Sequence, residues 1–146
     1  MSATGSVSAS LEDYLEAIIV AARRHGAARV KDIAQRLKVT SASVTGALRT
    51  LAEKGLIHYA PYEVITLTPE GETLAQGVLR RHEALKEFFI KALGVEEPEA
   101  ESAACAMEHE LPRNVLERLI HFVQYLDEHP RTRPQWTTEE PRPAGR

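Results

Sequence analysis

The sequence has few of the features that mark secreted, disulfide-stabilised or membrane proteins. Its 146 residues include a single cysteine, Cys105, so no disulfide can form within the chain. No apolar run approaches the roughly 20 residues that a membrane-spanning helix needs, and residues 1–10 lack the basic start and apolar stretch of a secretory signal. These absences predict a cytoplasmic protein without a membrane partner, and 43% hydrophobic with 27% charged residues is typical of a globular fold.

The charges are distributed unevenly, although the net charge of −3 indicates no partner by itself. Residues 29–54 hold six lysines or arginines and two acids, whereas residues 96–128 hold nine acids and two arginines. Phosphate is attracted by a local basic patch rather than by the average charge. The pattern therefore favours DNA binding in the first half and cation binding in the second, although two ordinary solvated faces would give the same distribution.

Hydrophobic periodicity predicts a mainly helical chain. The first helix is expected to begin at Ser10 as its N-cap and to end at His25-Gly26. Two short β-rich runs, 56–60 and 64–67, are predicted to pair as a hairpin around the intervening turn. The six predicted helices cover residues 10–25, 30–37, 41–54, 68–93, 98–110 and 114–128. Three helices followed by a hairpin is the order of a winged helix-turn-helix, which we assign to residues 1–75.

The third predicted helix can enter the major groove of double-stranded DNA, which is about 12 Å wide. Hydroxyl groups near its start can bind phosphate alongside free backbone N–H groups, and Arg49 can reach a phosphate or a guanine edge. Two alternatives stay open, namely that the hydroxyls only cap the helix or that the domain binds protein. Gly46 costs about 1 kcal/mol relative to alanine inside a helix, which indicates either close approach to DNA or weak base reading there. The candidate DNA-contacting residues are Arg29, Lys31, Thr40, Ser41, Ser43, Thr45 and Arg49.

The strongest chemical pattern lies in the acidic half. Cys105, Glu108 and His109 have the spacing i, i+3, i+4, which places them on one face of a helix. Thiolate, carboxylate and imidazole are ligands for Fe(II), Mn(II), Co(II), Ni(II) and Zn(II). Glu101 lies four residues before Cys105 on the same face. These residues predict a transition-metal site.

Two other predicted helices carry ligand types. Asp13 and Glu16 form an i, i+3 carboxylate pair, and His82 faces inward if its apolar neighbours form the core. Each residue has an ordinary alternative: Asp13 as a helix cap, His82 as a hydrogen-bonded histidine, and Cys105 as a small buried side chain. Their presence together on three helices favours the metal site.

Five segments follow one another along the chain: Leu11–Glu16, Leu37–Thr45, Leu67–Gly71, Arg81–Glu83 and Glu108-His109. Together they resemble the diphtheria-toxin-repressor family. The chain looks most similar to its manganese transport regulator branch, over about residues 11–129, in a short form without the SH3-like domain of the longer iron regulators. The resemblance implies a winged helix-turn-helix followed by a helical dimerisation and metal-binding domain, here residues 76–130, with 131–146 as a disordered tail rich in Pro, Arg and Thr.

The resemblance also implies which residues bind metal. At the position of Cys105 the manganese branch usually has glutamate and iron-responsive relatives have cysteine, so Mn(II) and Fe(II) are both candidates, with Zn, Co and Ni able to bind in vitro. Lys86 stands where the family has an acid, which implies that a second ion site is weakened or replaced by a lysine–carboxylate contact. The implied ligands are Asp13, Glu16, His82, Glu108 and His109, with Glu101 as an accessory ligand.

Together these expectations describe a repressor that binds a palindromic operator as a homodimer when loaded with metal, and that controls genes of metal homeostasis. An alternative is a winged-helix regulator that senses redox state at Cys105, or another ligand. An enzyme is not expected, since no nucleophile–base pair, phosphate loop or open-site zinc motif is present. The predicted dimer surface, which would alternatively complete a monomeric core, is formed by Leu116, Leu119, Ile120, Val123 and Leu126.

Overall fold

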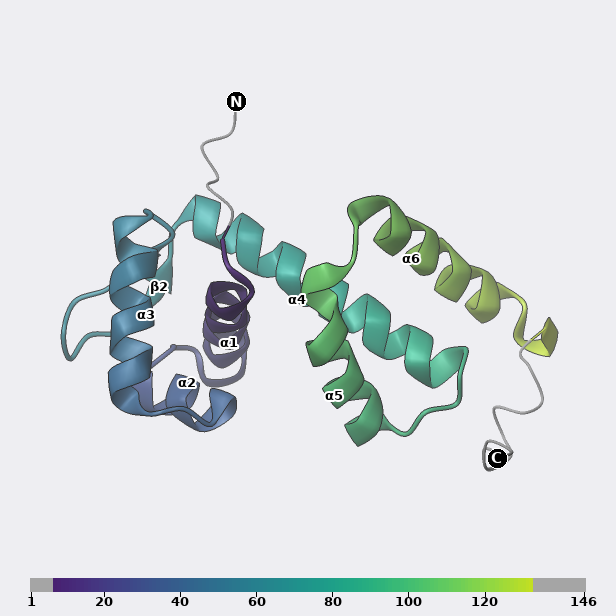
Figure 1. Cartoon of the computed structure of the whole chain (residues 1–146), viewed down its shortest axis with the longest axis horizontal. Coiled ribbons are helices and arrows are strands. Elements are labelled where there is room, and N and C mark those ends of the chain that lie inside the picture. The colour runs from purple at the N-terminus through teal and green to yellow at the C-terminus, as the bar shows by residue number, and fades with distance from the viewer. Residues whose placement is uncertain (1–6, 133–146) are drawn as a thin grey trace. The chain divides into compact units, whose positions relative to one another are not determined.

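The computed structural model describes residues 7–132, and the chain divides into two compact units between Leu79 and Arg80 (Figure 1). The expected disordered tail falls largely on residues 133–146, which lie outside the described residues. Within residues 7–132, no helix is both long and apolar enough to cross a membrane.

The first unit contains three helices and a small antiparallel sheet, as predicted for a winged helix-turn-helix. Its core is made of apolar side chains from all three helices, among them Leu15, Ile33 and Leu48, which are fully buried. The elements are α1 (Ala9–His25), α2 (Val30–Leu37), α3 (Ser41–Glu53), β1 (Ile57–His58), β2 (Thr66–Leu67) and the first turns of α4 (Pro69–Lys91).

The N-cap of α1 differs from the prediction, whereas its C-terminal end agrees with it. Ser10 is not the N-cap, because the hydroxyl of Ser8 accepts the backbone N–H of Leu11 at 3.2 Å and α1 begins at Ala9. The helix ends at His25 as predicted, and Gly26 continues with φ of 73°, a left-handed conformation that a glycine adopts without steric cost.

The wing is fixed at its base to both neighbouring helical segments. Ile57 pairs with Leu67 across the antiparallel strands, and the N–H of Ile65 donates to the carbonyl of Ala28, between α1 and α2, at 2.9 Å. The hydroxyl of Thr68 donates to the carbonyl of Gly55 and accepts the N–H of Gly71, which caps α4. The first unit is therefore one packed body rather than a helical bundle with a loose hairpin.

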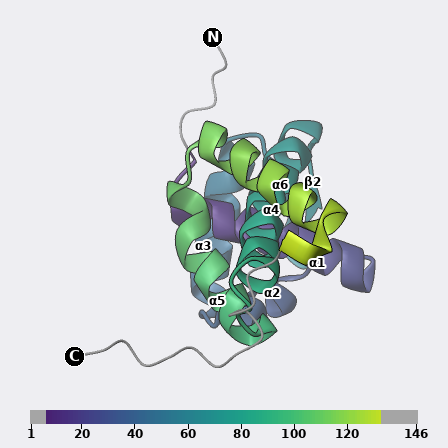
Figure 2. The same cartoon turned by 90° about the vertical axis from the view of Figure 1, so that its right-hand side faces the viewer.

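The second unit is helical. Two contacts attach α6 to the C-terminal half of α4: the rings of Phe88 and Phe122 lie 6.1 Å apart, and Lys91 Nζ donates to Asp127 at 2.9 Å. In the view of Figure 2, α5 and α6 flank α4. The elements after α4 are α5 (Glu97–Met107), the 3₁₀ turn η1 (Glu108–Glu110), α6 (Arg113–Glu128) and the 3₁₀ turn η2 (Pro130–Thr132).

The predicted helix over residues 98–110 is divided in the structure. Its last three residues form η1, and Leu111 then leaves the helix with φ of −81° and ψ of 117°. Proline disfavours helical geometry in the residue before it, so Pro112 forces Leu111 into an extended conformation and the preceding turn tightens. This change determines where Glu108 and His109 point.

Gly71 should be required for the junction between the wing and α4. A Cβ added there would overlap the carbonyl oxygen of Leu56, whereas one added at Gly77, an exposed glycine of the same helix, would meet open space. Gly71→Ala should destabilise the chain by about 2 kcal/mol, and Gly77→Ala should stabilise it by about 1 kcal/mol, measured by urea unfolding. Similar changes in both variants would contradict the close approach at Gly71.

Candidate metal centre and nucleic-acid interface

His82 lies at the centre of the candidate metal site. It projects from α4 and is only 3% exposed, which confirms that it faces inward. Its Nδ1 lies 2.7 Å from Glu108 Oε2, and its Nε2 lies 2.8 Å from Glu101 Oε1. An imidazole can donate to two carboxylates only when it carries two protons. A cation at either nitrogen would have to displace a proton, as metal binding to histidine requires.

Cys105 lies on α5, one helical turn after Glu101. Its Sγ is 3.7 Å from His82 Nδ1, and donor atoms of His82, Glu101 and Cys105 all lie within 4.8 Å of one another. Cys105 is exposed, so the alternative of a small buried side chain is wrong. Nitrogen, oxygen and sulfur donors at this spacing suit a divalent transition metal.

Glu108 is the most deeply buried acid among the described residues, at 0% exposure. Its Oε2 contacts His82, while its Oε1 makes no hydrogen bond with any described residue and lies 3.3 Å from His109 Nε2. Leaving a buried charged acceptor without a hydrogen bond costs about 1–3 kcal/mol or more. A divalent cation would satisfy this oxygen, so the donor set fits a metal ion.

The 3₁₀ turn changes the predicted grouping of ligands. Cys105, Glu108 and His109 were expected on one helical face. Instead, Cys105 groups with His82 and Glu101, while Glu108 on η1 contacts both His82 and His109. His82 is therefore shared by the two groups.

Asp13 and Glu16 lie on α1, which belongs to the first unit. The alternative that Asp13 caps the helix is wrong, because Ser8 holds that position. Glu16 is 4% exposed, and its Oε1 lies 3.8 Å from Arg36 Nη2 on α2.

Lys86 makes the expected lysine–carboxylate contact. Its Nζ lies 3.1 Å from Glu97 Oε1 and 3.2 Å from Glu101 Oε2, and the hydrogen bonds to Glu97 and then to Glu101 raise the pKa of Lys86. Burial would raise the pKa of Glu101, but the hydrogen bonds and charges of His82 and Lys86 outweigh it and hold that pKa below its ordinary value. Glu97 was not singled out from the sequence, although its spacing places it on the face of Glu101 and Cys105.

The candidate DNA-contacting residues gather on the first unit. Thr40 is the N-cap of α3 and accepts the N–H of Ser43 at 3.1 Å, so its capping role is real. Thr45 donates to the carbonyl of Ser41 at 2.9 Å. Arg49 is exposed and makes no ion pair within residues 7–132. The other candidates, which are all exposed, are Arg29, Lys31, Ser41 and Ser43.

Both halves of the chain match domains of a known protein family. The N-terminal DNA-binding domain of iron-dependent repressors matches residues 6–65, and their metal-binding and dimerisation domain matches residues 68–137. The HTH-type transcriptional regulator MntR of Lysinibacillus sphaericus (strain C3-41) is 37% identical over 121 residues, which cover 83% of this chain and 86% of that protein. The chain belongs to the iron-dependent repressor family. It is a metal-dependent transcriptional repressor, and its family is not one of enzymes.

Solved structures of related repressors have the same fold. A manganese-dependent transcriptional repressor in complex with manganese matches with a TM-score of 0.72 at 28% identity, over 79% of this chain and 53% of that one. The repressor ScaR with bound Zn²⁺ matches with a TM-score of 0.64 at 26% identity, over 79% of this chain and 54% of that one. The chain thus spans about half the length of these solved relatives.

The lowered pKa of Glu101 predicts a pH-dependent contribution to stability. Its ionised carboxylate stabilises the fold above the ordinary pKa of 4.5, and this contribution is lost as pH falls through the lowered value. In metal-free protein, Glu101→Gln should therefore be less stable than the original chain near neutral pH and approach it in acid, as measured by urea unfolding. Glu99→Gln, an exposed change on the same helix, is the control. A deficit of Glu101→Gln that stays constant with pH would contradict the contact.

Proposed function

We propose that the chain is a cytoplasmic, homodimeric repressor that binds a palindromic operator when it holds Mn(II) or Fe(II), and that it controls genes of metal homeostasis. The observation that carries the proposal is the buried carboxylate of Glu108, which contacts His82 through one oxygen and lacks a hydrogen bond at the other. This arrangement is costly without a cation and favourable with one.

The proposed ligands come from both units. His82, Glu101, Cys105, Glu108 and His109 provide the donors of the second unit. On the basis of their spacing and of the family resemblance, we propose that Asp13 and Glu16 of α1 are also metal ligands. Without metal, this many acidic groups repel one another if they are brought together. A bound cation would remove that repulsion and fix each DNA-binding head relative to the dimer axis, which is a shift between two populations of conformations.

The choice between Mn(II) and Fe(II) depends on Cys105. Thiolate is a softer ligand than carboxylate and favours the later transition metals, whereas Mn(II) prefers oxygen donors. The pair Asp13 and Glu16 supplies hard oxygen donors, as a manganese regulator would. We propose one ion at the His82 centre, because Lys86 already supplies a positive charge to Glu101 and Glu97.

The dimer surface predicted from the sequence needs revision. Of the five predicted residues, Leu116, Val123 and Leu126 are buried within the chain, as in the alternative of a monomeric core, whereas Leu119 and Ile120 are half-buried. The apolar side chains that α6 leaves exposed are Val115, Phe122 and Tyr125, each above 40% exposure. We propose that the partner subunit covers these three, since large apolar side chains gathered on one surface favour association.

Metal-dependent DNA selection tests the proposal directly. Purified protein is incubated with sheared genomic DNA in the presence of EDTA, Mn(II) or anaerobic Fe(II), and bound fragments are sequenced. We expect a palindrome enriched only with metal, with half-sites about one DNA turn, or roughly 34 Å, apart. Equal enrichment in EDTA would overturn the metal switch. Loss of EDTA-resistant binding on oxidation would then identify the exposed Cys105 as a redox sensor.

Matched variants connect this result to the site. Glu108→Gln should lose metal-dependent DNA binding, whereas Glu110→Gln, a neighbouring exposed change, should retain it. Cys105→Glu should bind Mn(II) more tightly relative to Fe(II) or Co(II) than the original chain does, because it replaces a soft donor by a hard one. An unchanged metal preference in Cys105→Glu would exclude the sulfur from the coordination sphere.

Gly46 of α3 tests the DNA interface separately. A Cβ at this position would meet nothing within 4 Å inside the chain, so glycine is not required by the fold. Gly46→Ala should therefore stabilise the protein by about 1 kcal/mol and weaken operator binding, since the added methyl group obstructs DNA. Gly77→Ala should give a similar stabilisation without changing DNA affinity, measured by fluorescence anisotropy. Undiminished affinity of Gly46→Ala would show that DNA does not approach this backbone closely.

A further inference from the structure

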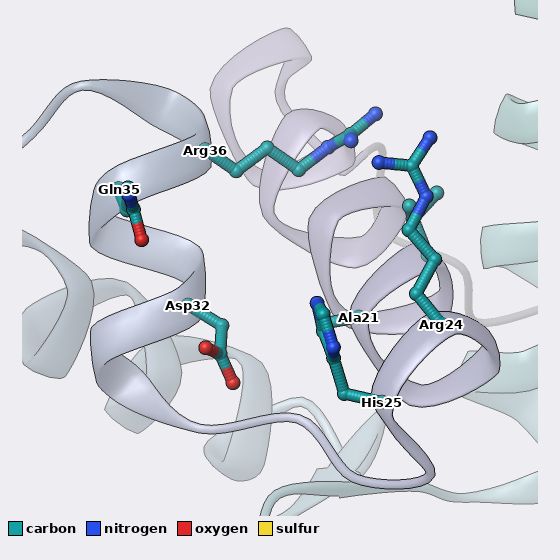
Figure 3. Close-up of a pocket in the computed structure, with 7 residues that line it drawn as sticks. Ala21, Arg24, His25, Asp32, Gln35 and Arg36 are labelled. Atoms are coloured by element: carbon teal, nitrogen blue, oxygen red, sulfur yellow. The ribbon is translucent and has the colours of Figure 1, made fainter.

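A groove between α1 and α2 of the first unit has the chemistry of an anion site. Its volume is about 250 Å³, and it contains no residue of α3 or of the wing. The guanidinium groups of Arg24 and Arg36 lie close together at one end, pointing toward each other, and Asp32 and His25 lie at the other end (Figure 3). The remaining lining residues are Val20, Ala21 and Gln35.

The positive charges of Arg24 and Arg36 have few acidic partners among the described residues. Arg24 makes no ion pair with any residue in the described part of the chain. Arg36 has Glu16 at 3.8 Å, beyond hydrogen-bond distance, and its side chain keeps 30% of its surface exposed. Two guanidinium groups that converge repel each other, and an oxyanion placed between them would remove this repulsion.

We infer that this groove binds a small phosphate ester, with its phosphate between Arg24 and Arg36. The planar guanidinium group donates parallel hydrogen bonds that match the oxygens of phosphate. Asp32 at the opposite end disfavours a second anionic group there, and its carboxylate can accept hydrogen bonds from hydroxyl groups of the ligand. The ligand is therefore anionic at one end and polar but uncharged at the other.

The site would also affect metal binding, an extension that rests on the proposed function. Arg36 lies beside Glu16, which is a proposed metal ligand. A phosphate that attracts Arg36 would reduce the competition of this arginine with a divalent cation for the Glu16 carboxylate. Phosphate ester and metal should then bind with positive coupling, which must be reciprocal.

Thermal unfolding and calorimetric titration test the site with inorganic phosphate and glycerol 3-phosphate, at constant ionic strength and without metal. We expect both probes to stabilise the full chain, glycerol 3-phosphate more strongly. In Arg24→Gln and Arg36→Gln, binding should weaken roughly tenfold or more, because one charge-assisted pair is lost. Arg23→Gln removes an exposed charge from the same helix outside the groove and should bind like the original chain.

Two outcomes would overturn the inference. Equal stabilisation of all four proteins would show general anion binding rather than a site. If the probes do not bind but Arg24→Gln and Arg36→Gln weaken DNA binding and reduce its salt dependence, the groove holds a backbone phosphate of DNA instead of a small ligand.

The proposed coupling between phosphate and metal binding is tested by measuring Mn(II) affinity. In a chelator-buffered Mn(II) titration without phosphate, Arg36→Gln should bind Mn(II) roughly two- to fivefold more tightly than the original chain, because the competing partially exposed ion pair is worth little more than that. Arg24→Gln should leave the affinity unchanged. Weaker or unchanged Mn(II) binding by Arg36→Gln would overturn the coupling alone, whereas absence of Mn(II) binding in the original chain would overturn the proposed function and leave the phosphate site standing.

Discussion

The buried contact between His82 and Glu108 is the interaction on which the second unit depends. It joins α4 to the 3₁₀ turn after α5, and it places an imidazole and a carboxylate together where water is excluded. Charged groups in such a place must be paired and hydrogen-bonded, because the cost of removing them from water is otherwise too high. The pair is only partly satisfied, since one oxygen of Glu108 lacks a hydrogen bond among the described residues. The centre is thus stable enough to form and polar enough to favour a cation.

Cationic side chains already accompany several of the proposed ligands. Lys86 contacts Glu101, and Arg36 lies near Glu16. His82 needs both of its protons to donate to its two carboxylate neighbours. A metal ion therefore competes with ammonium, guanidinium and protons rather than with water alone. Because a histidine ligand must give up a proton to a bound metal, metal binding at the proposed site is expected to depend on pH.

The DNA-binding head obeys a different constraint. Its three helices share an apolar core, and its wing is held by a backbone bridge to Ala28 and by the close approach of Gly71 to Leu56. These contacts join the three helices and the wing into one packed unit.

The sequence by itself determined most of the secondary structure. Apolar spacing predicted the helices, and Gly26 marked the end of α1, because these features depend on neighbours along the chain. The choice of Ser8 over Ser10 as the N-cap was missed, since several polar residues near a helix start can satisfy the same backbone donors. Spacing along the helices singled out Cys105, Glu108 and His109 and the carboxylate pair of Asp13 and Glu16. The family resemblance agreed with these ligands and added the expectation of a contact from Lys86.

Only the tertiary structure decided how the candidate ligands group. Helical spacing put Cys105, Glu108 and His109 on one face, but Pro112 converts the last turn to a 3₁₀ turn and gives Cys105 a different set of neighbours from Glu108. The structure also revealed Glu97 beside Lys86 and Arg36 beside Glu16, pairs that come from different helices. Local patterns report which face of a helix a side chain occupies. The partner on the facing helix depends on how the helices pack, and no spacing along the chain records that.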